Sequence, residues 1–404
     1  MSEEAIKIKV EKLTKIFGKQ PKQAVGLLRD GMTKDQILEK TGMTVGVNQA
    51  SFEVKDGEVF VIMGLSGSGK STLVRMLNRL IEPTSGDVWI GQENVSKMNK
   101  DQLRDVRRKR MSMVFQQFAL LPHKTILQNA EYGLEIRGIS KQERAKKAKE
   151  ALELVGLGGY LDKYPTELSG GMQQRVGLAR ALANDPDILL MDEAFSALDP
   201  LIRKDMQDEL LDLQQSVNKT IVFITHDLDE ALRIGDRIAL MKDGAIVQIG
   251  TAEEILMDPA NDYVERFVED VDLSKVLTAA HVMKRAETVT PDRGPRVALQ
   301  LMKDHGVSTI YVVDKKKKFL GILTANEASD AAKKDQSIED VLITDIPSVS
   351  TDTLLADLFE PMAQAAAPIP VIGEDGRLKG IIVRGSLIGA LAGNDKASES
   401  EVNS

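Results

Sequence analysis

A glycine-rich string, GLSGSGKS at residues 64–71, constrains this chain more than any other feature. It follows the apolar run VFVIM (59–63) and precedes STLVRMLNRL, whose apolar residues recur at helical spacing. In the order strand, loop, helix, glycines let successive backbone N–H groups and the helix N-terminus surround a polyphosphate. The string satisfies G-x-x-x-x-G-K-[ST] in that context, so it predicts a phosphate-binding loop rather than a simple flexible turn.

Two side chains of this loop carry the expected chemistry. Lys70 is expected to reach the β- and γ-phosphates of a nucleotide, and the Ser71 hydroxyl to bind Mg²⁺. A dinucleotide-binding G-x-G-x-x-G does not fit, because its third glycine is missing. The loop therefore favours a nucleoside triphosphate.

A second apolar run, DILLM (187–191), ends in two acids, Asp192 and Glu193. At the carboxyl edge of a parallel sheet, where ligands bind, Asp192 is expected to hold Mg²⁺ directly or through water. Glu193 is placed to activate the attacking water as general base. Acids at strand ends also serve as caps. The catalytic interpretation of this pair therefore depends on the phosphate-binding loop in the same chain.

The string LSGGMQQR (168–175) marks a further helix start. Ser169 has the character of an N-cap, and two glycines after it leave backbone N–H groups exposed. This arrangement binds anions, so one domain carries two helix ends that can face phosphate.

The remaining chain separates into regions. Between residues 51 and about 270, short apolar runs such as TIVFIT (220–225) alternate with amphipathic stretches, which predicts parallel strands and helices in an α/β sheet. An insert at 19–45 has apolar residues at helical spacing, with Gly31 as punctuation. Residues 307–329 and 366–388 repeat at a period of 59, and two such units should pack as a pair. The polar tail at 394–404 is expected to be disordered.

Composition narrows the function classes. The 404 residues carry 53 Lys+Arg against 61 Asp+Glu, a net charge of −8, which argues against a general nucleic-acid binder. The basic segment 102–111 is either a nucleic-acid contact or a solvated helix face, and the second is favoured. The chain has no cysteine, so disulfides and thiolate metal sites are excluded. No secretory signal or apolar run of about 18 residues is visible, so a cytoplasmic protein is expected.

With these motifs, residues 11 to about 270 resemble the ATPase subunit of an ABC transporter. LSGGMQQR matches the signature motif of that family. In the family two ATPase domains close head-to-tail, and each signature loop completes the nucleotide site of the other. The resemblance implies a homodimer that binds and hydrolyses ATP with Mg²⁺.

Site residues carry over where the family's motifs match this sequence. Gln116 corresponds to a glutamine that senses Mg²⁺ and the membrane subunit, and His226 to a switch histidine at the γ-phosphate, so with Glu193 they form the expected catalytic set. Mg²⁺ is expected at Ser71, Gln116 and Asp192. Phe17 stands where the family stacks an aromatic on adenine, although a core position is the alternative. The residues expected to contact ATP are Phe17, Gly64, Leu65, Ser66, Gly67, Ser68, Gly69, Lys70, Ser71, Thr72, Ser169, Gly170, Gly171, Gln173 and Asp199.

The insert and the ending DEAFSALDPLIR resemble the glycine-betaine/proline-betaine importers. That resemblance implies separate membrane permease subunits, alone or fused to a substrate-binding domain, which dock through residues 118–139 at the cytoplasmic face of the membrane. It also implies osmoregulation. Three alternatives stay open: an importer of another small solute, a soluble ABC ATPase, and a nucleotide-binding regulator whose hydrolysis is incidental. An intact Glu193 and His226 argue against the last.

Residues 279–393 resemble a tandem pair of CBS domains, modules that often bind adenine nucleotides. Nucleotide-binding versions carry Thr/Ser-x-x-Asp at the last helix, where this chain has Thr324-x-x-Glu327 and, in the second copy, Val383-Arg-Gly-Ser386. A simple AMP or ATP site is therefore not expected, and a cyclic dinucleotide, cyclic di-AMP, is the candidate ligand. The expected fold is α/β, and its parts are an ABC-type nucleotide-binding domain at 1–270, a linker at 271–278, and CBS domains (βαββα) at 279–337 and 338–393.

Four lysines, Lys315, Lys316, Lys317 and Lys318, fall in one turn of the first CBS copy. Beside a membrane, such a cluster could contact anionic lipid at about 1 kcal/mol per lysine. Salt screens these contacts, so internal ionic strength could regulate the ATPase. An ordinary solvated turn is the alternative.

Overall fold

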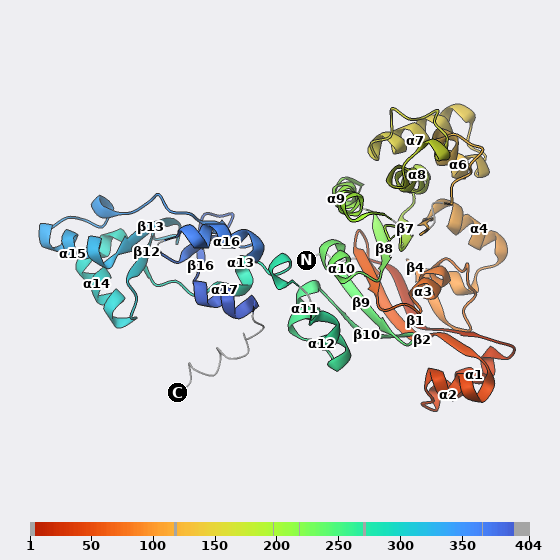
Figure 1. Cartoon of the computed structure of the whole chain (residues 1–404), viewed down its shortest axis with the longest axis horizontal. Coiled ribbons are helices and arrows are strands. Elements are labelled where there is room, and N and C mark those ends of the chain that lie inside the picture. The colour runs from red at the N-terminus through yellow and green to blue at the C-terminus, as the bar shows by residue number, and fades with distance from the viewer. Residues whose placement is uncertain are drawn as a thin grey trace. The chain divides into compact units, whose positions relative to one another are not determined.

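A computed structural model describes residues 5–116, 119–196, 198–217, 219–269, 272–365 and 367–391. It divides into two compact units, Met1–Asp270 and Val271–Ser404 (Figure 1). The tail expected at 394–404 lies outside the described residues. Within the described part, none of the helices is both long enough and apolar enough to cross a bilayer.

A six-stranded sheet forms the core of the first unit. The apolar runs predicted as buried strands are its neighbours β3, β8 and β7, and all five residues of β3 are buried. Every pairing in the sheet is parallel except that of β10 with β9. In sheet order the strands are β10 (Ala245–Gly250), β9 (Arg237–Lys242), β3 (Val59–Met63), β8 (Thr220–Thr225), β7 (Ile188–Asp192) and β6 (Met111–Val114).

Helices pack against this sheet because strands that are apolar throughout must be covered. The helices α5, α6, α7 and α8 also pack on one another and form a helical lobe (Figure 1). The helices are α3 (Lys70–Leu77), α4 (Lys100–Lys109), α5 (Ile126–Ala130), α6 (Tyr132–Ile136), α7 (Lys141–Leu154), α8 (Gly170–Ala183), α9 (Pro200–Val217), α10 (Leu228–Ile234), α11 (Ala252–Met257) and α12 (Asp262–Val268).

A second, antiparallel sheet packs against the first. Along β2, buried and exposed positions largely alternate, as expected where one face is buried. The Phe52 ring of this sheet stacks on Phe60 of β3, with ring centroids 5.1 Å apart. Both phenylalanines belong to one hydrophobic cluster, so the two sheets share a core. In sheet order the strands are β2 (Thr44–Lys55), β1 (Ile6–Phe17), β4 (Ser85–Ile90) and β5 (Glu93–Asn94).

The insert is a helical pair, α1 (Pro21–Arg29) and α2 (Lys34–Thr41), between β1 and β2. The helical spacing seen in the sequence is confirmed, and Gly31 makes the turn with a φ of 84°. Ala24 and Ile37 pack with residues of β1 and β2 in a small separate cluster. The insert is therefore attached through its own apolar contacts.

The second unit confirms the internal repeat. Ile310 pairs with Leu323 in the first copy, and Ile369 pairs with Ile382 in the second, both at the period of 59 residues. The two sheets are β11 (Thr288–Val289), β12 (Thr309–Val313) and β13 (Phe319–Thr324), and β14 (Val349–Ser350), β15 (Ile369–Ile372) and β16 (Leu378–Ile382). The helices are α13 (Ala279–Val282), α14 (Pro295–Asp304), α15 (Ala325–Lys334), α16 (Leu355–Gln364) and α17 (Arg384–Leu391).

The segments that lead into the two copies are exchanged. Lys284, ahead of the first copy's sheet, forms a bridge with Ile381 of the second, with N···O distances of 2.8 and 2.9 Å. Ile343, ahead of the second copy's sheet, bridges Ile322 of the first, at 2.9 and 3.0 Å. The cores follow this pattern, because Leu277 packs in the cluster of the second copy and Ile338 in that of the first. Leu277, in the segment expected as a linker, is thus a core residue.

Candidate functional site

The phosphate-binding loop joins β3 to α3, and its glycines are required by the backbone. Gly64, Gly67 and Gly69 have φ values of 148°, 78° and 101°, which side chains rarely allow. A Cβ at Gly64 would lie 2.3 Å from the Met241 carbonyl oxygen, and one at Gly69 would lie 2.2 Å from that of Gly46. The close packing of loop and neighbouring backbone thus accepts only glycine at both positions.

Lys70 is folded back onto this loop. Its Nζ donates to the carbonyl oxygens of Gly64 at 2.7 Å and Leu65 at 3.1 Å, and the residue is 5% exposed. Burial lowers the pKa of the Lys70 ammonium, and the nearby carboxylates of Glu193 and Asp192 act in the opposite direction. A buried ammonium that donates to neutral carbonyl oxygens is well prepared for an anionic ligand.

Asp192, at the end of β7, is buried beside the start of α3. Arg75 of α3 binds its Oδ2 through Nε at 3.1 Å and Nη2 at 3.0 Å. Magnesium prefers oxygen ligands, often one or two carboxylates together with waters and substrate phosphates. Ser71, Gln116 and Asp192 offer a hydroxyl, an amide oxygen and a carboxylate, so they fit that ion. No motif in the sequence indicated this contact between Arg75 and Asp192.

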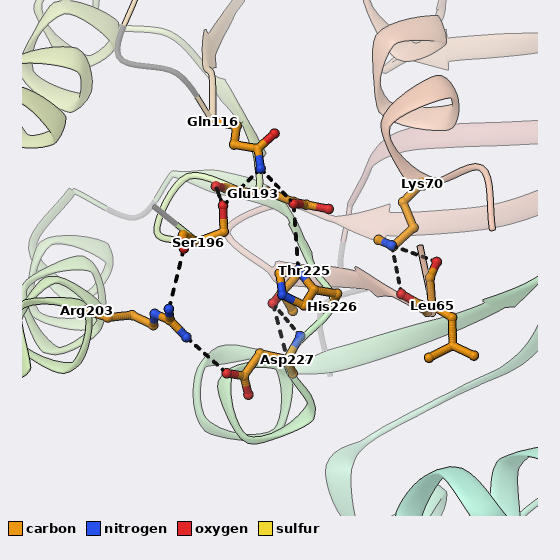
Figure 2. A network of polar contacts seen from close by, with 10 residues as sticks. Leu65, Lys70, Gln116, Glu193, Ser196, Arg203, Thr225, His226 and Asp227 are labelled. Atoms are coloured by element: carbon orange, nitrogen blue, oxygen red, sulfur yellow. Dashed lines mark hydrogen bonds and ion pairs between the residues drawn. The ribbon is translucent and has the colours of Figure 1, made fainter. Parts of the chain in front are cut away.

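Glu193 lies at the centre of a polar network (Figure 2). Its Oε2 is 3.2 Å from Gln116 Nε2 and 3.6 Å from His226 Nδ1. Ser196 Oγ donates to the Glu193 carbonyl at 2.9 Å and accepts from Gln116 Nε2 at 3.2 Å. The structure therefore brings together Gln116, Glu193 and His226, the three residues expected to be catalytic.

Ser169 and Gln173 of the signature motif contact residues close to them in the sequence, whereas Arg175 binds Glu209 of α9 at 2.6 Å. Ser169 is the N-cap of α8, as predicted, and its Oγ accepts from Met172 N at 3.3 Å. Gln173 Nε2 donates to the Leu168 carbonyl at 3.2 Å, while Ser169 and Gly170 are exposed. Asp199 caps the start of α9 by accepting from Ile202 N at 3.1 Å. Ser169 and Gly170 are thus on the surface, as a residue that meets another subunit must be.

Phe17 is the last residue of β1, and its side chain is partly exposed to solvent. Its Cε2 lies 2.8 Å from the position that a Cβ on Gly46 would take, and Thr72 Cγ2 lies 3.5 Å from the same position. The insert does not displace Phe17, because β2 resumes at Thr44, directly opposite it. The residue is 42% exposed, so it is not a core residue, and Lys15 Nζ lies 5.1 Å from the centroid of its ring.

Sequence reasoning also missed Arg203 on α9. Its guanidinium binds Asp227, next to His226, and the carbonyl oxygens of Ser196 and Leu198. The only signal was its place just after the SALDP string (196–200), which does not reveal the contact.

Comparisons with known proteins identify the family of each part of the chain. Residues 47–196 match the family described as "ABC transporter", and residues 279–334 and 338–393 each match the "CBS domain". The "Glycine betaine transport ATP-binding protein OpuAA" of Bacillus subtilis is 68% identical over 401 residues, 99% of this chain and 96% of that protein. The "Glycine betaine/carnitine transport ATP-binding protein GbuA" of Listeria monocytogenes is 61% identical over 391 residues, 96% of this chain and 98% of that protein.

Solved structures of ATP-binding cassettes also match this chain. The ATP-binding cassette MJ0796, in a "dimeric structure of a post-hydrolysis state" bound to ADP and Pi, has a TM-score of 0.52 and 33% identity. The match covers 61% of this chain and 98% of that one. The resemblance drawn from LSGGMQQR and from the repeat is thereby confirmed. This chain belongs to the ABC transporter family, as an ATP-hydrolysing, ATP-binding subunit that carries a tandem pair of CBS domains.

Proposed function

We propose that this subunit powers the uptake of glycine betaine, or a related quaternary amine osmolyte, through separate membrane subunits. The supporting observation is identity of 68% along nearly the whole chain, CBS pair included, with a protein named for glycine betaine transport. Relatives named for other solutes match less of the chain. TmoW of Pelagibacter ubique, named for trimethylamine N-oxide, matches 70% of it, and OpuBA of Bacillus subtilis, named for choline, matches 85%.

Hydrolysis in this proposal needs two copies. ATP lies on the phosphate loop and Lys70, and the exposed Ser169 of the second copy, together with its half-buried Gly171, closes over the γ-phosphate. Bound Mg²⁺, held by Ser71, Gln116 and Asp192, would neutralise phosphate charge. Glu193 then accepts the proton of the attacking water, with His226 beside it at 3.6 Å. If specific activity stays constant on dilution into a purely monomeric range, the shared site is wrong.

A cavity of about 370 Å³ supports docking of a permease segment. Phe115, Ala119, Tyr132 and Arg180 are among its lining residues, and Phe115 directly precedes Gln116. Phe118 lies outside the described residues. A permease segment seated there would contact Phe115, which is next to Gln116, and Gln116 binds Glu193. Closure of the dimer around ATP would then move the permease. The subunit would then be peripheral, at the cytoplasmic face of the membrane.

Cyclic di-AMP is the proposed ligand of the CBS pair. Thr324 Oγ1 caps α15 by accepting from Glu327 N at 3.5 Å, and position 327 carries glutamate where nucleotide-binding versions carry aspartate. That observation argues against an AMP-like site in the first copy. Calorimetry of the full chain should show binding of cyclic di-AMP and not of AMP, and the absence of any heat with cyclic di-AMP would remove this ligand.

The lysine turn at 315–318 is proposed to contact anionic lipid. All four residues are exposed, and Lys315 Nζ lies 3.9 Å from Asp292 Oδ2. Changing the four lysines to Gln should shift the ionic strength at which transport is activated in vesicles with anionic lipid. The double variant Lys333→Gln/Lys334→Gln on α15 is the control. If the four-lysine variant does not shift the activation threshold, the lysines form an ordinary solvated turn and the lipid contact is wrong.

Uptake in vesicles tests the proposed substrate. The chain is reconstituted with its permease, and radiolabelled glycine betaine, choline and proline are compared. We expect ATP-dependent accumulation of glycine betaine that is abolished in Glu193→Gln. Intact ATP hydrolysis without uptake of any of the three would refute the substrate class while leaving the ATPase assignment in place.

A further inference from the structure

The residues around Glu193 form a closed circuit of contacts. Ser196 Oγ binds the Glu193 carbonyl at 2.9 Å, and Arg203 binds the carbonyl of Ser196. Arg203 also binds Asp227, the residue after His226, and His226 returns to Glu193 at 3.6 Å. Figure 2 shows the dashed contacts running from Glu193 through Ser196 and Arg203 to Asp227. Arg203 links two loops that are far apart in the sequence, one with Ser196 and Leu198 and one with Asp227.

Arg203 makes three contacts with a single guanidinium group. Nη2 donates to the carbonyl oxygens of Ser196 at 3.5 Å and Leu198 at 3.2 Å. Nη1 lies 3.3 Å from Asp227 Oδ2. Because the guanidinium is planar and rigid, it fixes the direction of all three acceptors relative to one another. Lysine, with one ammonium on a flexible stem, could not reproduce this arrangement.

Asp227 uses its two carboxylate oxygens differently. Oδ2 binds Arg203, while Oδ1 caps α10 by accepting from Glu230 N at 3.2 Å. Its backbone N–H donates to Thr225 Oγ1 at 2.9 Å, which closes the tight loop that carries His226. Holding Asp227 therefore holds the backbone on both sides of His226.

We propose that Arg203 is a positioning residue for ATP hydrolysis: it ties the loop of His226 to the Ser196–Leu198 backbone, which keeps His226 next to Glu193. It does not touch the reacting atoms. This inference does not depend on which solute is transported. It depends only on ATP hydrolysis at this site, and the wild-type rate measured in the same assay establishes that hydrolysis.

The chain supplies a matched control on the same two helices. Asp208 of α9 and Arg233 of α10 form an ion pair with an N···O distance of 2.5 Å. Their side chains are 50% and 35% exposed, and neither belongs to the circuit around Glu193. Loss of this pair weakens the α9–α10 contact without changing what holds the loop of His226.

The experiment compares Arg203→Gln with Arg233→Gln in the full-length chain with Mg-ATP. We expect Arg203→Gln to lower kcat about 10- to 100-fold with the KM for ATP within about twofold, because misplacing a catalytic group costs rate. Arg233→Gln should leave kcat within about twofold, as expected for an exposed pair. If both variants lose kcat equally, or if the losses follow the loss of melting temperature, the positioning role is wrong.

Two further variants separate positioning from packing. Asp227→Asn keeps an oxygen to cap α10 but removes the charge that Arg203 binds. Its loss of kcat should not add to that of Arg203→Gln, because both break the same link. Arg203→Lys restores the charge without the fork and should recover only part of kcat. Full additivity of the two losses, or no recovery by lysine over glutamine, would overturn the proposal.

Discussion

At the residue scale, the position of Glu193 depends on its own backbone. Its φ is 47°, in the left-handed region that costs a non-glycine residue about 1–2 kcal/mol. In that conformation its backbone N–H still reaches the Ile224 carbonyl at 3.2 Å, and its carboxylate lies between Gln116 and His226. Backbone strain held in place by a hydrogen bond is typical of functional positions.

Replacing Glu193 by Gln should separate binding from chemistry. The amide has nearly the same shape but cannot accept a proton from water, so hydrolysis should fall about 100-fold or more. ATP affinity should be unchanged, because Lys70 and the loop remain. Equilibrium binding and single-turnover hydrolysis measure the two. Near-normal turnover would take the general-base role away from Glu193.

Replacing Lys70 by Ala should weaken nucleotide binding itself. The buried ammonium is the cation that sits within the phosphate loop, and the two carbonyls it holds would lose their donor. ATP affinity, measured by calorimetry, should fall at least about tenfold, since a charge-assisted contact contributes about 1.5–3 kcal/mol. Lys97→Ala, an exposed lysine paired with Asp87, is the control. Equal affinity in the Lys70 and Lys97 variants would contradict the loop assignment.

These residues show what motifs reveal and what they omit. The spacing of Lys70, Asp192 and Glu193 behind apolar strands predicts their shared edge of the sheet. The partners Arg75 and Arg203 could not be predicted, because each contact depends on how a helix packs, and no local pattern encodes that.

At the element scale, α9 and α10 hold a buried acid between them. Glu230 is 6% exposed and accepts from Gln207 Nε2 at 3.1 Å. Burial raises the pKa of the Glu230 carboxyl above its ordinary value of 4.5, against the effect of its hydrogen bonds. The folded state therefore retains this proton at pH values where the unfolded chain has lost it, and stability falls as pH rises through the folded pKa.

Glu230→Gln should remove that pH dependence. The amide does not titrate, so at neutral pH the variant avoids the free-energy cost of burying this carboxyl group and should melt at a higher temperature than wild type. Below pH 4.5, where the carboxyl is protonated in both states, the advantage should disappear. Thermal melts from pH 4 to 8 measure the difference, with the exposed Asp229→Asn as control. A lower melting temperature at neutral pH would show that Gln207 and Thr225 stabilise the ionised form after all.

Element types followed from the sequence more readily than partners did. The runs VFVIM and TIVFIT became β3 and β8, and the spacing around Ala24 and Ile37 became α1 and α2. The antiparallel sheet on top of the core was not predicted, since an alternating strand shows which face is buried but not what covers it. The exchange of lead-in segments in the CBS pair was not predicted either, because the sequence of a strand does not show which other segment pairs with it.

At the scale of the whole molecule, that exchange predicts the result of a deletion. Removing residues 338–404 takes Ile338 from the core of the first copy and Ile343 from the edge of its sheet. Limited proteolysis should then cut rapidly within residues 279–337, whereas the full chain should resist. Point substitution of the exposed Phe359 is the control for a changed surface. Continued protection of residues 279–337 would show that one copy folds without the other.

The pairing of Lys284 with Ile381, and of Ile343 with Ile322, has a broader consequence. A gene that ended after the first repeat would encode a CBS domain without part of its core and sheet edge, rather than a less stable version of the same domain. We therefore expect the two repeats to be gained or lost together rather than one at a time.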